Sequence, residues 1–381
     1  MEYKLEDLFT LQMGKTPSRN NPEYWDSPDQ KWISISDLSK CGKYIRETKE
    51  YISDKAVEES GISLIPENTV IMSFKLSIGK VAITAQPMYS NEAIMSFRDK
   101  RVVELLPDYV YYLLLGHDWE QGTNKAVMGK TLNKATLSQI KVRIHPLETQ
   151  HSIVSTLDKL QSIITHRKQQ LAKLDELIKA RFVEMFGDVD LTPQKSEWTT
   201  VSEIGTVVGG STPKTSIEEY WDGDLKWITP AELNLDTGYL YDSIRKITKA
   251  GAESCSLQLM PINTVILTSR APIGKVAIAG TEFYCNQGFK NIICKDTINP
   301  RYLYSLLLFN TDYLNSLGRG ATFKEISKAI VEKIRIPIPQ IELQNQFADF
   351  VKQVDKSKVA VQKALDEAQL LFDSLMQEYF G

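Results

Sequence analysis

The chain contains one internal repeat, and this duplication constrains its fold more than any other feature of the sequence. The hexapeptide Ile-Gly-Lys-Val-Ala-Ile stands at 78–83 and again at 273–278, so the two copies lie 195 residues apart. Asn-Thr-Val-Ile recurs at 68–71 and 263–266 with the same spacing. Because this period is far longer than that of a solenoid repeat, each copy should form a domain-sized unit.

Further matches occur in the same order in both halves. They are Gly-x-Thr-Pro at 14–17 and 210–213, Tyr-Trp at 24–25 and 220–221, Lys-Trp-Ile at 31–33 and 226–228, Asn91 and Asn286, Glu-x-Gln at 148–150 and 342–344, and Phe-Gly at 186–187 and 380–381. The spacing falls to about 191 near Gly129 and Gly320, which places small insertions in loops. The sequence therefore predicts two halves that share a framework and differ in detail.

Each half divides into a mixed block and a long helix. Short β-branched runs bounded by Gly, Pro and Asn, such as 69–72 and 264–268, predict strands, and residues 108–115 and 299–308 predict short helices. Strands with a few helices indicate an α+β fold. We expect two tandem homologous domains at 1–147 and 192–340, each followed by a long helix, at 148–187 and 341–381.

The two long helical segments carry apolar residues at alternating spacings of three and four, the heptad pattern of a coiled coil. Two matched seams on one chain favour pairing of the helices with each other; the alternative is that each helix packs on its own domain. Arg167 and Lys358 also fall on the seam, where we expect them to snorkel or to set the register. The apolar seam positions are Ile153, Leu157, Leu160, Ile164, Leu171, Leu174, Ile178, Phe347, Val351, Val354, Val361, Leu365, Phe372 and Leu375.

Composition and charge exclude several classes of protein. The formal net charge of −3 gives no global positive field, so any contact with nucleic acid must come from local patches. The four cysteines form no Cys-x-x-Cys pair, and the first residues do not resemble a signal peptide. No apolar run reaches the roughly 18 residues of a membrane span. We therefore expect a soluble cytoplasmic protein with reduced thiols.

The sequence lacks the motifs that catalysis requires. Gly14 and Gly129 each precede Lys-Thr, but neither has the glycine five residues upstream that a phosphate-binding P-loop needs. No Gly-x-Gly-x-x-Gly loop is present for a dinucleotide or adenosyl cofactor. The four histidines all lie in the first half, without metal-ligand spacing to cysteine. We expect no catalytic residue, no metal site and no cofactor in this chain.

Basic, amide and hydroxyl side chains recur beside glycines in both halves instead. Backbone amides, hydroxyls and lysines hold phosphate oxygens, while Arg, Lys, Asn and Gln read base edges in the major groove of DNA. The alternative is that the glycines merely form turns and the lysines merely face solvent. The candidate DNA-binding residues are Lys15, Thr16, Lys31, Lys75, Lys80, Asn91, Lys130, Thr212, Lys214, Lys226, Arg270, Lys275, Asn286, Gln287, Lys290 and Arg319.

These residues resemble those of the specificity (S) subunit of type I restriction-modification systems. The resemblance rests on Ser-Arg-Ala-Pro-Ile-Gly-Lys-Val-Ala-Ile at 269–278 and Asn-Gln-Gly-Phe at 286–289, together with the repeated motifs above. It extends over essentially the whole chain and occurs twice. The first half departs from the Ser-Arg-Ala-Pro block, with Phe74, Lys75 and Leu76 in its place.

The resemblance implies a non-catalytic subunit whose two target recognition domains each read one half of a bipartite DNA site. It also implies that the helices form an antiparallel coiled coil, which spaces the domains and docks two modification subunits. Those methyltransferase partners would use S-adenosylmethionine, and restriction subunits that use ATP and Mg would join in a full system. The alternatives are a specificity subunit of a methyltransferase-only system, a coiled-coil scaffold without a DNA role, and an enzyme acting alone.

Overall fold

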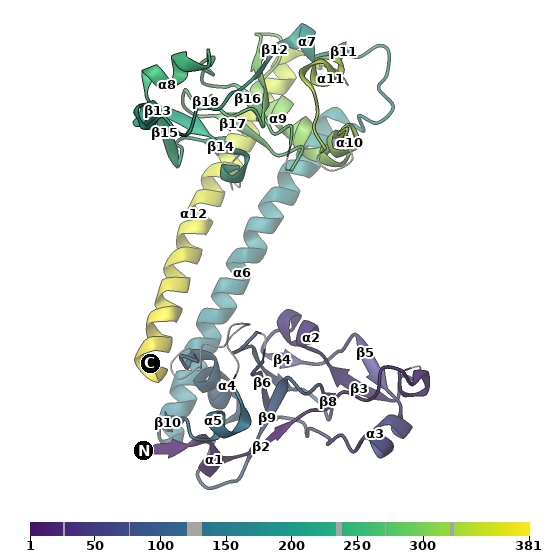
Figure 1. Cartoon of the computed structure of the whole chain (residues 1–381), viewed down its shortest axis with the longest axis vertical. Coiled ribbons are helices and arrows are strands. Elements are labelled where there is room, and N and C mark those ends of the chain that lie inside the picture. The colour runs from purple at the N-terminus through teal and green to yellow at the C-terminus, as the bar shows by residue number, and fades with distance from the viewer. Residues whose placement is uncertain (26, 76, 120–131, 234–237, 271, 321–323) are drawn as a thin grey trace. The chain divides into compact units, whose positions relative to one another are not determined.

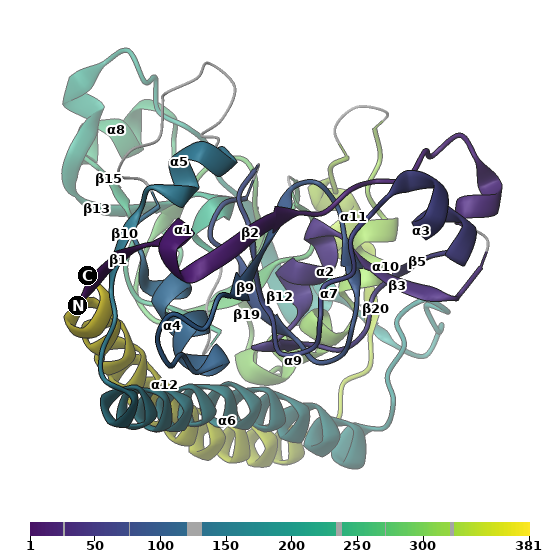
Figure 2. The ribbon, with the colours of Figure 1, turned by 90° about the horizontal axis from the view of Figure 1, so that it is seen from below.

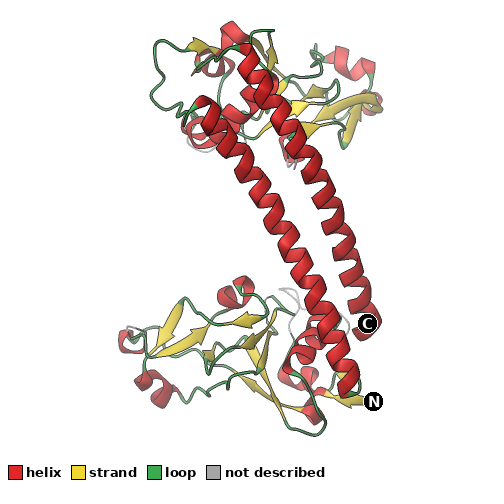
Figure 3. Ribbon diagram, turned by 180° about the vertical axis from the view of Figure 1, so that it is seen from behind, coloured by secondary structure: helices red, strands yellow, loops and turns green. Residues whose placement is uncertain are grey.

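The computed structural model divides the chain into two compact units, each of which is described by itself. Unit 1 consists of Met1–His166 and Leu365–Gly381, and unit 2 is Arg167–Ala364 (Figure 1). Each unit combines strands with short helices and one segment of each long helix (Figure 3). The residues that the structure describes are 1–25, 27–75, 77–119, 132–233, 238–270, 272–320 and 324–381.

Unit 1 contains a five-stranded sheet beside a three-stranded sheet. The larger sheet has the order β2 (Phe9–Met13), β9 (Ile94–Asp99), β6 (Val70–Ser73), β7 (Val81–Thr84) and β4 (Tyr44–Ile45). The smaller one has the order β5 (Glu50–Ile52), β3 (Gln30–Ile33) and β8 (Tyr89–Ser90), and β1 (Glu2–Lys4) pairs with β10 (Lys141–Arg143). The β7–β4 and β3–β8 pairs are parallel and the other pairs are antiparallel.

Unit 2 has the same strand order and the same strand directions. Its larger sheet is β12 (Gly205–Gly209), β19 (Lys290–Cys294), β16 (Val265–Leu267), β17 (Val276–Ala279) and β14 (Tyr239–Leu240). Its smaller sheet is β15 (Arg245–Ile247), β13 (Trp221–Ile228) and β18 (Tyr284–Cys285), and β11 (Thr199–Thr200) pairs with β20 (Arg335–Ile336). This identity of topology confirms the tandem duplication and the α+β fold that the sequence repeat predicts.

Each unit also contains short helices. In unit 1 they are α1 (Leu5–Leu8), η1 (Pro22–Tyr24), α2 (Ile35–Lys40), α3 (Asp54–Ser60), α4 (Pro107–Gly116) and α5 (Lys134–Ser138). In unit 2 they are α7 (Val201–Ile204), η2 (Glu218–Tyr220), η3 (Pro230–Glu232), α8 (Lys249–Ser254), α9 (Pro300–Phe309), α10 (Thr311–Ser316) and α11 (Lys328–Lys333). The helices predicted at 108–115 and 299–308 correspond to α4 and α9.

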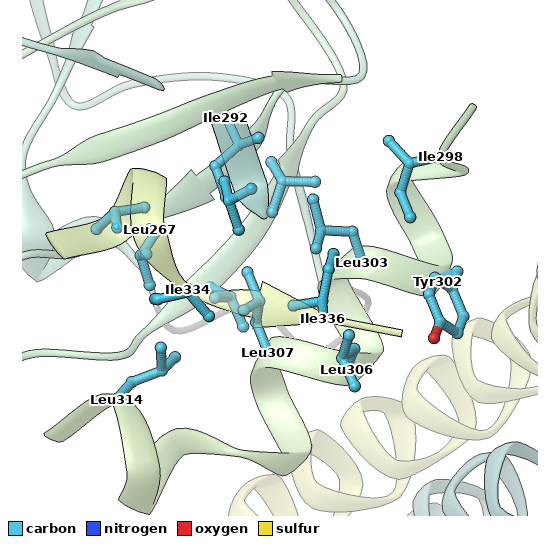
Figure 4. Close-up of a cluster of buried hydrophobic side chains, with 14 of the residues drawn as sticks. Leu267, Ile292, Ile298, Tyr302, Leu303, Leu306, Leu307, Leu314, Ile334 and Ile336 are labelled. Carbon is cyan, nitrogen blue, oxygen red and sulfur yellow. The ribbon is translucent and has the colours of Figure 1, made fainter. Parts of the chain in front are cut away.

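The larger sheet of unit 2 is buried on both faces. Val265 and Leu267 on β16 belong to a core that includes Tyr302 and Leu306 of α9. Figure 4 shows Leu267 in this core. Ile266 points to the other face and packs in a second core. Strands covered on both faces are apolar at successive positions, which explains why the Thr-Val-Ile-Leu run does not alternate with polar residues.

A buried hydroxyl stabilises the hairpin that contains the repeated hexapeptide. In unit 2 the Thr268 hydroxyl donates to the Pro272 carbonyl at 2.7 Å and accepts from the Lys275 amide at 2.9 Å. Ser73 makes the corresponding pair of bonds in unit 1. Gly79 and Gly274 adopt φ angles of 84° and 88° in the turn, a region that favours glycine. Within the repeated hexapeptide, the glycine thus forms the turn and the lysine amide binds the buried hydroxyl.

A buried glutamine ties each long helix to its domain. Gln150, 1% exposed, accepts from the Leu106 amide at 3.1 Å and donates to the Glu104 and His145 carbonyls at 2.9 Å each. Its side chain thus satisfies three backbone groups around the start of α4 and of α6 (Leu147–Phe186). In Figure 2, α4 lies between the sheet of unit 1 and α6.

Gln344 repeats this arrangement at the start of α12 (Ile341–Phe380). It accepts from the Asn299 amide at 2.8 Å and donates to the Pro339 and Thr297 carbonyls at 2.8 and 3.4 Å. The Glu-x-Gln match in the sequence therefore marks the joint between each domain and its helix.

Within unit 2 the two long helices run antiparallel. The Phe182 ring of α6 lies 5.4 Å from the Phe347 ring of α12, and the Asp175 carboxylate of α6 lies 2.7 Å from the Lys358 ammonium of α12. From the first contact to the second, the residue number on α6 decreases from 182 to 175 while the residue number on α12 increases from 347 to 358, as in an antiparallel pair. Lys358 is on the predicted seam and fixes the register through this ion pair.

No described helix combines the length and apolar character required to cross a membrane.

Most of the predicted seam positions are buried, and the others are half-buried. The buried positions are Ile153, Leu157, Leu160, Ile164, Phe347, Val351, Val354, Leu365 and Phe372. The half-buried positions are Leu171, Leu174, Ile178, Val361 and Leu375. Phe182, outside the predicted seam, is 2% exposed because it also packs on Tyr302 and Phe309 of α9. The two helices therefore contact each other, as the heptads predict, and Phe182 of α6 also packs on α9 of the second domain.

Candidate nucleic-acid interface

In unit 1 two tryptophans hold the Gly-x-Thr-Pro loop. The Trp32 indole donates to the Lys15 carbonyl at 3.1 Å, and the Trp25 indole donates to the Ser18 carbonyl at 3.1 Å. The two rings are themselves packed edge to face, with centroids 5.0 Å apart. Two motifs that are separate in sequence thus form one structure, in which tryptophans fix the backbone of the loop.

Unit 2 holds its loop in the same way. The Trp227 indole donates to the Ser211 carbonyl and the Trp221 indole donates to the Lys214 carbonyl, both at 3.2 Å. The ring centroids are 5.1 Å apart, again edge to face. A loop held at two carbonyls presents its side chains in a preset geometry, as a recognition site requires.

The first glycine of each loop allows a close approach to the next turn. A Cβ at Gly14 would lie 2.1 Å from the Ser90 carbonyl oxygen, and one at Gly210 would lie 2.0 Å from that of Cys285. Any larger residue would force the backbones apart. The glycine therefore places the loop directly beside the turn at Asn91 or Asn286.

The loop and the turn are then joined through side chains. The Thr16 hydroxyl donates to the Glu92 carboxylate, and the Thr212 hydroxyl donates to the Gln287 carbonyl oxygen at 2.5 Å. The structure thus brings together two predicted residues in unit 2, and it adds Glu92 to the candidate site in unit 1. The hydroxyl bond lowers the pKa of Glu92, and nearby Lys75 and Arg19 lower it further.

The turn uses the oxygens of its own asparagines. The Asn91 side-chain oxygen accepts from the Ala93 amide at 3.0 Å, and that of Asn286 accepts from the Gly288 amide at 2.8 Å. These bonds direct the asparagine oxygens into the turn. Their role in the free chain is to shape the surface that carries Glu92 and Gln287.

An arginine covers the tryptophan pair in each unit, although the two arginines come from different places. The Arg19 guanidinium lies 3.7 Å from the Trp25 ring centroid and pairs with Glu50. The Arg245 guanidinium, on β15, lies 3.9 Å from the Trp221 ring centroid. Neither arginine is among the candidates from the sequence, because their positions do not match in the repeat.

Two predicted basic side chains of unit 2 face one glutamate, and a third basic residue pairs with that glutamate through its backbone. Arg270 Nη1 lies 3.8 Å from Glu325 Oε2, and Lys290 Nζ lies 3.3 Å from Glu325 Oε1. The Arg319 amide donates to the Glu325 carbonyl at 3.1 Å, and the Glu325 amide donates back at 3.0 Å. We call Arg270, Lys290 and Arg319 the basic cluster of unit 2. Glu325, its central residue, has no counterpart among the repeated motifs.

Other predicted residues bind loops of their own domain. Lys31 donates to the Arg46 carbonyl at 2.8 Å, and Lys226 donates to the Tyr241 carbonyl at 2.8 Å. Lys80 donates to the Ser39 hydroxyl at 2.6 Å. These contacts give the three lysines a bracing role in the free chain. Of the remaining candidates, Lys214 accepts from the Trp221 indole through its carbonyl, and the Lys275 amide donates to the Thr268 hydroxyl. Lys130 lies outside the described residues.

The two surfaces offer hydroxyls, amides and cations on rigid loops, groups that bind phosphate oxygens and base edges. Within the described ranges, no group of three or more His, Cys, Asp or Glu side chains could hold a metal ion.

The chain is similar to curated specificity subunits of type I restriction enzymes. It is 40% identical over 184 residues to the MjaIX specificity subunit of Methanocaldococcus jannaschii, an alignment that covers 47% of this chain and 43% of that relative. It is 24% identical over 321 residues to the MjaX specificity subunit, a putative type I enzyme subunit of the same organism (75% and 72% covered). To the EcoR124I/EcoR124II specificity subunit of Escherichia coli it is 26% identical over 272 residues (65% and 63% covered).

Solved structures show the same fold. The S subunit from M. genitalium matches with a TM-score of 0.59 at 14% identity, over 100% of this chain and 96% of that one. A chain from a study of complex assembly in the type I restriction-modification system matches with a TM-score of 0.62 at 16% identity, over 100% and 97%. The family model described as type I restriction modification DNA specificity domain matches twice, at residues 1–176 and 193–368. With two such matches covering most of its length, this chain belongs to the family of type I restriction-modification DNA specificity domains.

Proposed function

We propose that the chain is the DNA sequence-recognition subunit of a type I restriction-modification complex, in which each domain reads one half of a bipartite site. The duplicated interface carries this proposal. Both units hold the same loop on the same tryptophan pair, yet they expose different side chains, Glu92 in one and Gln287 in the other. Equal scaffolds with unequal exposed groups are what two readers of different half-sites require.

We assign the target recognition domains to residues 1–147 and 192–340, and the helices at 148–187 and 341–381 to spacing and docking. Exposed apolar side chains on the helices support docking of other subunits: Leu177 and Val359 in unit 2, and Ile163, Leu370 and Leu371 in unit 1. In this proposal two modification subunits supply the methylation chemistry with S-adenosylmethionine. Restriction subunits, where present, supply the chemistry that uses ATP and Mg, and the complex acts in the cytoplasm.

Sequencing of adenine methylation in host DNA, with the gene present and deleted, tests the proposal. We expect a split motif of two short half-sites that is methylated only when the gene is present. If every methylated motif persisted after deletion of the gene, DNA recognition by an active complex would be contradicted. Co-purification with modification subunits would then separate an inactive complex from a scaffold without a DNA role. Cleavage of unmethylated DNA carrying the motif distinguishes a full system from a methyltransferase-only one.

The same sequencing tests whether the helices set the gap between the half-sites. Deleting 168–174 and 359–365 together removes one heptad from each helix and leaves the Asp175–Lys358 pair in register. Each helix then shortens by about 10 Å, which is about three base pairs along the duplex. We expect unchanged half-sites with a shorter gap. As a control, the exposed residues of the same heptads are replaced by alanine, which leaves the length of each helix unchanged. If this control variant also shortened the gap between the half-sites, helix length would not be what sets the gap.

A further inference from the structure

One carboxylate lies inside the basic cluster of unit 2. Glu325 Oε1 and Oε2 face Lys290 and Arg270 at 3.3 and 3.8 Å, and the Glu325 side chain is 41% exposed. Lys290 is also hydrogen-bonded to the Ser269 hydroxyl at 3.2 Å. A negative charge thus sits among the cations on the surface that this chain would present to a polyanion.

The backbone around Glu325 fixes this placement. Glu325 exchanges two backbone hydrogen bonds with Arg319, at 3.0 and 3.1 Å, and the next residue, Ile326, donates to the Ser269 carbonyl at 3.0 Å. Ile326 is itself fully buried. The carboxylate is therefore anchored beside Arg270 and Lys290.

Unit 1 places a carboxylate in a similar environment from a different position. Glu92 accepts from the Thr16 hydroxyl, and the positive charges of Lys75 and Arg19 act on it. The equivalent position in unit 2 is Gln287, which is uncharged. Glu92 and Glu325 thus each lie near cations of a candidate surface, although the two carboxylates do not correspond in the repeat.

The effect of such a carboxylate depends on what approaches it. A phosphate that binds the cations non-specifically brings negative charge close to the carboxylate and is repelled. A base edge that binds Arg270 carries no net charge and meets less repulsion. A residue of this kind disfavours wrong partners more than the right one, which is one of the two routes to specificity.

We propose that Glu325 and Glu92 are specificity-determining residues that suppress non-specific DNA binding by the two domains. The proposal rests on the proposed function, because it assumes that these surfaces face DNA. It assigns Lys290 a positioning role, since its ammonium is held between Ser269 and Glu325 and its side chain is only 13% exposed.

The test uses the full chain in complex with its modification subunits, as Glu325→Gln, Glu92→Gln and wild type. Dissociation constants are measured for a duplex that carries the methylated motif and for one that lacks it, between 50 and 200 mM salt. We expect each variant to bind the duplex without the motif about threefold more tightly. The salt dependence of that binding should steepen by about 0.9 in log–log slope, as one more phosphate is engaged. Binding to the motif should change less, so that the ratio between the two falls.

Glu253→Gln is the matched control, because it removes the same charge from an exposed carboxylate on α8 that pairs with Lys249. It should leave the ratio unchanged. The Glu92→Gln variant should fold, since unit 2 already has glutamine at the equivalent turn position.

Three results have distinct meanings. Unchanged non-specific binding and salt slope in both variants would overturn the proposal. Weaker binding to the motif, with relaxed preference at one base pair, would also overturn it and make the carboxylate a base reader. A wild-type complex that prefers no duplex would instead contradict the proposed function itself.

Discussion

The guanidinium over the tryptophan pair comes from Arg19 in unit 1, before the smaller sheet begins, whereas in unit 2 it comes from Arg245 on strand β15. Glu50, the residue of unit 1 that corresponds to Arg245, is the acid that pairs with Arg19. The indole N–H groups of the tryptophan pair, in contrast, donate to equivalent loop carbonyls in both units. The two halves have therefore kept the side chains that bind backbone and exchanged the sources of surface charge.

The joint between domain and helix shows the same contrast. Both units keep the buried glutamine, but the second residue of the neighbouring helix has opposite charges in α4 and α9. In unit 1, Asp108 of α4 pairs with Lys43 at 2.5 Å, and Asp158 of α6 pairs with the same lysine at 2.7 Å. In unit 2 the residue equivalent to Asp108 is Arg301, which pairs with Asp355 of α12. The charge of this helix residue is therefore opposite in the two units, and its partner comes from a different segment in each: Lys43 before β4 in unit 1 and Asp355 of α12 in unit 2.

The largest effect should come from the shared glutamines. Gln150→Leu and Gln344→Leu each leave one backbone N–H and two carbonyls without their side-chain partner in a buried site. Each unpaired buried group costs about 1–3 kcal/mol, so we expect a loss of about 3 kcal/mol or more in the free energy of unfolding. Hydrogen exchange at the Leu106 and Asn299 amides should accelerate only in the unit that carries the change.

Gln346→Leu, an exposed position on α12, controls for the change in composition. If one glutamine variant were destabilised and the other were as stable as this control, the two joints would not be equivalent. The comparison between the units would then fail at its most similar point.

The framework could be predicted from the sequence because backbone-binding residues recur at a constant spacing. The glycines and tryptophans recur because both copies form the same turns and hold the same loop carbonyls, so the repeat reveals them. The buried face of the long helices was only partly predictable. A heptad seam describes packing of one helix on another, but Phe182 also packs on α9, which widens the buried face beyond the seam.

The candidate site was less predictable, for the opposite physical reason. Lys31 and Lys226 recur in the repeat because they brace a loop carbonyl, so their recurrence does not indicate contact with DNA. Arg245 and Glu325 depend on contacts between segments far apart in the chain, and no local pattern marks them. Recurrence therefore identifies the scaffold, and the charged groups of the site require the structure.

Exchanging the source of the arginine tests whether the two tryptophan pairs are interchangeable. Arg245→Glu removes the guanidinium over Trp221 and should cost about 1 kcal/mol of stability, a typical cation–π contribution. Adding Thr215→Arg, at the position equivalent to Arg19, recreates the arrangement of unit 1. We expect the double variant to recover most of the loss, as measured by urea unfolding with tryptophan fluorescence.

Thr215→Arg alone is the control, since it adds an arginine while Arg245 is still in place. A double variant no more stable than Arg245→Glu would show that each tryptophan pair is shaped for its own arginine. The exchange of charge sources would then be a property of whole domains rather than of single residues.

The smallest effect concerns Asp355, whose equivalent in unit 1 is the uncharged Gln161. Burial raises the pKa of Asp355 above its ordinary value of 3.8, although Arg301 and Lys358 act to lower it. Below 3.8 both the folded and the unfolded chain hold this proton. As the pH rises above that value the unfolded chain loses the proton first, so this group makes the folded state less stable with rising pH until its raised pKa is passed.

Asp355→Asn removes this dependence, so the stability of wild type relative to the variant should fall over that window, as measured by urea unfolding at a series of pH values. Asp349→Asn, at an exposed position on the same helix, should run parallel to wild type. If the curve of Asp355→Asn also ran parallel to that of wild type, Asp355 would make no pH-dependent contribution to stability. Its charge in unit 2 would then matter no more than the uncharged Gln161 does in unit 1.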